Sequence, residues 1–112
     1  MNLQQALAEM HLAVNTVDFA APRLSELGMR QCVAAASYRC IDVAAEMWVR
    51  SIDMAEDELA SSSRDAMGLC ADVLWSAHYR DRDVRGLHFD LQRVASHLGW
   101  LVRQRSVEAW MV

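Results

Sequence analysis

The residues with the greatest capacity for chemistry lie in one stretch, SAHYRDRDVRGLHFD, which runs from Ser76 to Asp90. It contains three arginines, three aspartates and two histidines, whereas the surrounding sequence is rich in Ala, Val, Leu, Met and Trp. Histidine transfers protons near neutral pH, so acid–base chemistry is one interpretation of this stretch. A hydrated connection between two buried helices is the other, because charges of alternating sign keep a turn in water.

Two residues of this stretch, Arg82 and His88, have five residues between them where the last predicted helix begins. This spacing resembles the R-x4–6-H signature of HEPN ribonucleases, which are also small helical bundles. The resemblance covers only this junction. It implies that Arg82 and His88 act together on a phosphodiester across a dimer, with Asp83 in the polar position after the arginine. As a simple connection the segment needs no catalytic role, since Asp83 can cap the next helix.

Other catalytic and metal-binding patterns find no support in the sequence. None of the four histidines has a Glu three residues before it, as bundle metal sites require, and the three cysteines lack zinc-finger spacing. His97 is similar to the histidine of phosphotransfer domains, but the lysine of that family is missing before Gly99. The four glycines are scattered singly, so no phosphate loop is predicted. We therefore expect no metal and no cofactor.

The composition predicts one all-α domain over residues 1–112. Apolar residues make up 54% of the chain, and one Pro and four Gly are too few for many tight turns. The net charge of −4 argues against a nucleic-acid partner, which needs a basic face. All 11 basic residues are arginine, which favours a bacterial or phage origin. Without a leader or a long apolar run, we expect a cytoplasmic protein with free thiols and no membrane partner.

Apolar residues spaced alternately four and three apart predict four helices, near 2–17, 28–60, 63–80 and 84–106. The second is long, and is either continuous or kinked near 34–38. The three serines 61–63 are predicted to separate it from the third, with Ser62 and Asp65 forming a capping box. Together these segments predict a four-helix bundle-like domain. The apolar seams are Leu3, Leu7, Met10, Val14 and Val17; Ile41, Ala45, Trp48, Ile52, Ala55 and Leu59; Met67, Cys70 or Ala71, Leu74 and Ala77; and Leu87, Leu91, Val94, Leu98 and Leu101.

Four Trp and seven Met in 112 residues are more large apolar side chains than one small bundle core readily covers. Trp48 lies on its seam and is predicted in the core, whereas Trp75 and Trp100 lie about 100° away from theirs. With Trp110 and Met111 at the apolar end of the chain, they are predicted to bind another polypeptide. The acidic residues predicted to face a basic partner are Asp42, Glu46, Asp53 and Asp57.

These patterns together favour a homodimer that works by binding another protein, with no enzymatic activity. A bacterial adaptor, a toxin-neutralising or immunity-type partner and a phage inhibitor all belong to this class. The alternative is the HEPN-like ribonuclease that would use Arg82 and His88.

Overall fold

Helix α1, Leu3–Ala20, begins at two reciprocal side-chain caps. The backbone N–H of Gln5 donates to the side chain of Asn2 at 2.8 Å, and the backbone N–H of Asn2 donates to the side chain of Gln5 at 3.2 Å. Donors that have no partner inside the helix are thereby satisfied. This capping box, carried by the pattern Asn-x-x-Gln, went unnoticed at the level of sequence.

The computed structural model describes residues 2–53, 57–79 and 83–111, and their side chains except at 51–53, 57, 59–60, 79 and 105–111. After α1 comes a 3-10 turn, Ala21–Arg23, in which Pro22 takes a first-turn position where its missing N–H costs nothing. The remaining helices are α2, Glu26–Asp53; α3, Asp57–Tyr79; and α4, Val84–Met111. The predicted all-α fold of four helices is confirmed for the described residues.

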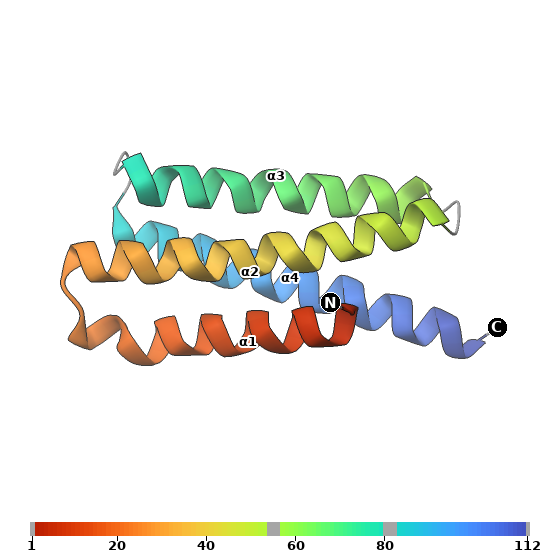
Figure 1. Cartoon of the computed structure of the whole chain (residues 1–112), viewed down its shortest axis with the longest axis horizontal. Coiled ribbons are helices and arrows are strands. Elements are labelled where there is room, and N and C mark those ends of the chain that lie inside the picture. Colours follow the sequence, from red (N-terminus) through yellow and green to blue (C-terminus); the bar gives the residue numbers. More distant parts are fainter. Residues whose placement is uncertain (1, 54–56, 80–82, 112) are drawn as a thin grey trace.

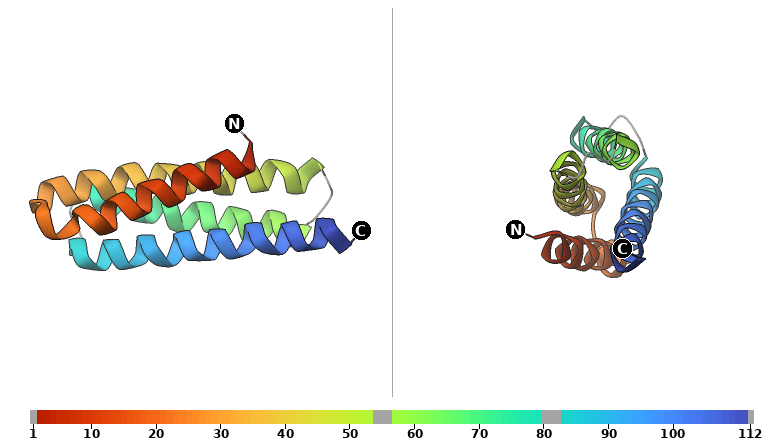
Figure 2. Two further views of the ribbon diagram at one scale, coloured as in Figure 1. Left: turned by 90° about the horizontal axis from the view of Figure 1, so that it is seen from below. Right: turned by 90° about the vertical axis from the view of Figure 1, so that its right-hand side faces the viewer.

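The four helices run alternately in opposite directions along one bundle (Figure 1). In the end-on view each helix lies beside the one that precedes it, and α4 closes the ring against α1 (Figure 2). The N-terminal ends of α2 and α4 and the C-terminal ends of α1 and α3 therefore meet at the same end of the bundle (Figure 1). The described parts of the stretch from Ser76 to Asp90, residues 76–79 and 83–90, belong to the ends of α3 and α4 that lie here.

Two predicted boundaries are wrong. The second helix ends at Asp53 rather than at 60, and α3 has already begun at Asp57. The serines 61–63 therefore lie inside α3, and Ser62 does not cap a helix with Asp65. Serine disfavours a helix only weakly, and Ser63 is fully buried in the bundle, so packing overrides its preference. Helix α2 is continuous through 34–38, which decides between the two predicted forms.

The core confirms the predicted seams of α1 and α4 with one partial exception. Every seam residue of α4 is buried, and in α1 only Leu7 is partly exposed. In α3 Cys70 and Ala77 of the predicted seam are buried, and Ala71, the alternative to Cys70, is exposed. The predicted Met67 and Leu74 are only partly buried, and the residues before them, Ala66 and Val73, are buried instead. None of the helices in the described part of the chain has the length and apolarity that crossing a bilayer takes.

Helix α2 corrects the prediction for Trp48. The residues that point into the core are Val33, Ala36, Cys40, Val43, Ala44 and Met47. Cys40, Ala44 and Met47 each lie one residue before a residue of the predicted seam. The buried stripe is therefore rotated about the helix axis by about 100° relative to the predicted seam. The predicted core residue Trp48 is 37% exposed, while Met47 is 1% exposed. Helix α2 thus carries a second apolar stripe beside the core stripe, in which Trp48 is exposed, Ala45 is partly exposed and Ile41 packs against the edge of the core.

Candidate functional site

The predicted site residue His88 is held by a carboxylate from α1. Its imidazole Nε2 donates to Oδ1 of Asp18 at 2.5 Å, and the side-chain amide of Gln92 donates to the same oxygen at 3.0 Å. His88 and Gln92 are one helical turn apart on α4 and so face α1 together. This cluster ties the last turn of α1 to the first turns of α4.

A groove of about 560 Å³ lies beside His88, between the start of α2 and the start of α4. Arg85 lines it, and so do two acidic residues, Glu26 and Asp83. The carbonyl of Asp83 accepts from the N–H of Leu87 at 3.1 Å, which puts Asp83 at the start of α4 as predicted. Arg82 lies outside the described residues, so its position relative to His88 is not described.

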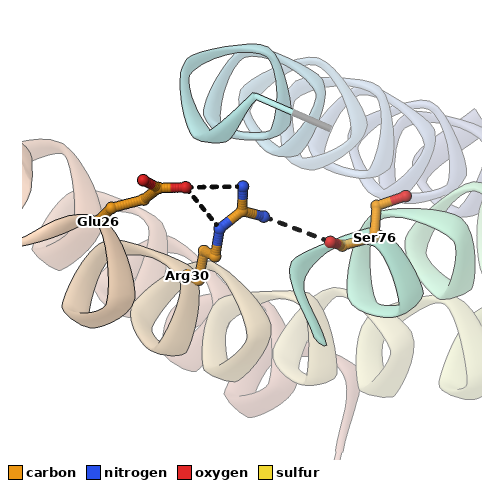
Figure 3. Close-up of polar contacts among 3 residues, drawn as sticks. All are labelled: Glu26, Arg30 and Ser76. Atoms are coloured by element: carbon orange, nitrogen blue, oxygen red, sulfur yellow. Dashed lines mark hydrogen bonds and ion pairs between the residues drawn. The ribbon is translucent and has the colours of Figure 1, made fainter. Parts of the chain in front are cut away.

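A buried arginine that sequence reasoning missed lies at the same end of the bundle (Figure 3). Arg30 on α2 is 4% exposed. Its guanidinium donates to the carboxylate of Glu26 at 3.0 and 3.2 Å and, through Nη1, to the backbone carbonyl of Ser76 at 3.4 Å. Ser76 lies in the last turn of α3, where carbonyls lack intrahelical partners and the helix dipole is negative. Arg30 therefore caps α3 from α2.

Two of the cysteines meet in the core between α2 and α3. Cys40 and Cys70 are 0% and 1% exposed. A hydrogen bond with Cys40, together with burial, raises the pKa of the Cys70 thiol well above its usual range. Cys32 is partly exposed and lines a shallow groove between α1 and α2. Only the thiolate reacts with thiol reagents, so the three cysteines differ in reactivity.

We expect a dithiobis-nitrobenzoate titration of the native protein to show one fast thiol, Cys32. All three thiols of the chain react after unfolding in guanidinium. The variant Cys32→Ser is the control, and its native form should show no fast phase. Equal reaction rates for the three native thiols would contradict the buried contact between Cys40 and Cys70.

Among the described side chains, large apolar residues are exposed on every helix. Trp75 is 59% exposed and Trp100 is 49% exposed, as the interface prediction requires. The plane of the His97 ring lies 14° from that of Trp100, with ring centroids 6.2 Å apart. The side chains of the predicted contacts Trp110 and Met111 lie outside those described.

One of these surfaces is the outer face of α2, defined here as Tyr38, Ile41, Ala45, Trp48 and Val49. Tyr38, Val49 and Trp48 are 54%, 53% and 37% exposed, Ala45 is partly exposed, and Ile41 at the edge of this face is partly buried and packs against the core. By their spacing in the sequence, these five residues lie on the side of the helix that is turned away from Cys40 and Val43.

The predicted acidic residues are divided between two helices. Asp42 and Glu46 lie beside the outer face of α2 and are partly exposed. Arg39 pairs with Glu9 at 3.1 Å and with Asp42 at 3.6 Å, which leaves one negative charge in excess in this trio. Asp53 is the last residue of α2 and Asp57 is the first of α3, so the four acidic residues do not share one helix as the predicted span 28–60 requires. The side chains of Asp53 and Asp57 are not among those described.

The described residues contain no gathering of three or more His, Cys, Asp or Glu side chains suited to a metal ion. No family model, curated protein or solved structure matches the chain.

Proposed function

We propose that this chain is a homodimeric, non-enzymatic module that binds another protein in the cytoplasm of a bacterium or in a phage-infected cell. An adaptor, an inhibitor and an immunity-type protein all work in this way. The observation that carries the proposal is the apolar outer face of α2. The outward side of a bundle helix is ordinarily polar, and a helix that is apolar on both sides is ordinarily covered on both.

The residues of this face suit recognition of a helix. Tyrosine and tryptophan are the side chains that most often anchor protein interfaces, because they bury a large area at small entropic cost. Tyr38 and Val49 are eleven residues apart, which is about 16 Å along the helix. That length accommodates about three turns of a partner helix lying along α2.

The charges beside the face favour a basic partner. Asp42 and Glu46 flank it, and the positive charge of Arg39 is shared between Glu9 and Asp42. An amphipathic helix with arginine or lysine next to its apolar stripe would meet complementary charge here. Such charges at the rim act mainly on the association rate and are screened by salt.

The test uses two synthetic helical peptides with the same apolar stripe, one flanked by arginines and the other by glutamates. In fluorescence anisotropy, the arginine peptide should bind about tenfold more tightly at low salt, and high salt should remove the difference. Val49→Glu places a charge on the outer face and should weaken binding of the arginine peptide at least about tenfold.

The matched control is Asn15→Glu, which adds the same charge at an exposed position of α1. It should bind the arginine peptide like the unaltered protein, and circular dichroism should show equal helicity for both variants. If Val49→Glu and Asn15→Glu bind the peptide equally well, the outer face of α2 is not the binding surface.

A further inference from the structure

A second surface of the bundle lies over α3 and α4, around an open groove of about 770 Å³. Its floor includes Val73 and Val94, and Leu69 and Phe89 at its edge are 52% and 59% exposed. A surface with this much exposed apolar area is ordinarily covered by another molecule. Both helices that form it carry a regular stripe of exposed residues.

The two stripes have the same alternating spacing of three and four. The α3 stripe is Asp65, Gly68, Asp72 and Trp75, and the α4 stripe is Phe89, Arg93, Ser96 and Trp100; all eight residues are exposed. Spacing of this kind keeps one line of residues along a helix facing a neighbouring helix. Each stripe therefore has the geometry of one side of a helix–helix contact.

The stripes are complementary at three of their four levels. Helices α3 and α4 are antiparallel neighbours, and the end of α3 at Tyr79 and the start of α4 at Val84 lie at the same end of the bundle (Figure 1). Number 82 is about midway between these two ends in the sequence, so residues equally far from it in the sequence lie at about the same height in the bundle. Trp75 and Phe89 are each seven residues from it, and Gly68 and Ser96 are each fourteen. Asp72 lies level with Arg93 to within one residue. At these three levels a large residue thus corresponds to a large one, a small residue to a small one and an acidic residue to a basic one, whereas at the fourth level Asp65 corresponds to Trp100.

We infer that this surface binds a second copy of the chain about a two-fold axis parallel to the helices. Such an axis keeps every residue at its own height and brings α3 of one protomer against α4 of its partner. Trp75 then meets Phe89 of the partner subunit, and Asp72 meets Arg93 of the partner subunit, each contact occurring twice. The small pair formed by Gly68 and the partner's Ser96 lets the helix backbones approach closely.

Two features within one chain support this arrangement. The guanidinium carbon of Arg93 lies 5.8 Å from the ring centroid of Phe89, so the ring restrains the charge that would meet Asp72. A Cβ added at Gly68 meets nothing within 4 Å, so this glycine serves no packing need inside the bundle. A glycine in an exposed helix interior costs stability relative to alanine, and a close contact between protomers gives it a role.

This inference deepens the homodimer part of the proposed function, and it does not depend on peptide binding by α2. Sedimentation equilibrium should show a dimer for the unaltered chain. Gly68→Glu should be monomeric yet as helical as the unaltered chain by circular dichroism, because its new side chain has open space within the protomer and better helix propensity. Val49→Glu is the matched control, and it should dimerise normally while losing the arginine peptide.

Charge reversal tests the contact between protomers directly. Asp72→Arg and Arg93→Asp should each self-associate about tenfold more weakly, because each creates two like-charge contacts per dimer. Mixed in equal amounts, the two variants should form a heterodimer of nearly unaltered affinity. In that heterodimer both contacts between positions 72 and 93 are between opposite charges. A monomeric unaltered chain, a dimeric Gly68→Glu or the absence of a heterodimer would each overturn the inference. None of these results alters the expectation for the arginine peptide.

Discussion

Met47→Ala is expected to lower the free energy of unfolding by about 2–5 kcal/mol, the range for truncating a fully buried large aliphatic side chain. Met47 is 1% exposed and lies on the inner stripe of α2. Its removal takes contacts from the core and leaves a cavity that the surrounding helices fill only in part. Guanidinium denaturation at one fixed protein concentration measures the loss.

The control for Met47→Ala is Val49→Ala, two residues further along the same helix. Val49 is 53% exposed, so this change should shift the free energy of unfolding by less than about 0.5 kcal/mol. The comparison decides which stripe of α2 builds the core. Comparable losses for the two variants would show that the outer face is packed inside the protein.

Arg30→Ala is expected to destabilise the protein by about 2–3 kcal/mol. The change removes the charged donor that caps α3 at Ser76 and leaves a void where the buried guanidinium lay. A cation at the C-terminal end of a helix also interacts favourably with the helix dipole, and that contribution is lost as well. Thermal unfolding followed by circular dichroism gives the measurement.

Two further variants separate the causes of this loss. Arg30→Met keeps much of the side-chain volume but has no donor, so the loss that remains reports on the capping hydrogen bond and the charge. Arg50→Ala removes an exposed arginine from the last turn of the same helix and should change stability by less than about 0.5 kcal/mol. An Arg30→Ala protein as stable as Arg50→Ala would contradict the capping role.

The sequence predicted α1 and α4 well because each has one dominant apolar stripe. Leu91 and Leu98 are buried, as their spacing requires. The same reasoning failed for α2 because this helix has two apolar stripes. The spacing alone does not say which of them faces the core. The predicted seam through Trp48 was the more regular one, but Trp48 is exposed and Ile41 is only partly buried. The side chains of Ile52, Ala55 and Leu59, which complete that predicted seam, lie outside those described.

The polar contacts could not be predicted because they join residues that are distant in the chain. Arg30 and Ser76 are 46 positions apart, and Asp18 and His88 are 70 apart. Only the packing of α2 against α3 and of α1 against α4 brings them together. The stretch from Ser76 to Asp90 is distinguished by its charged composition. The residues that contact Ser76 and His88 within it, Arg30 and Asp18, lie elsewhere in the sequence.

Hydroxyl-radical labelling of side chains, read by mass spectrometry with and without the arginine peptide, tests the central claim most directly. The claim is that the outer face of α2 is open in the protein and is covered by a partner helix. Trp48 and Tyr38 should be labelled in the free protein and protected by the peptide, while Met47 stays unlabelled in both. Trp48 unlabelled in the free protein, or labelled equally in both states, would contradict it.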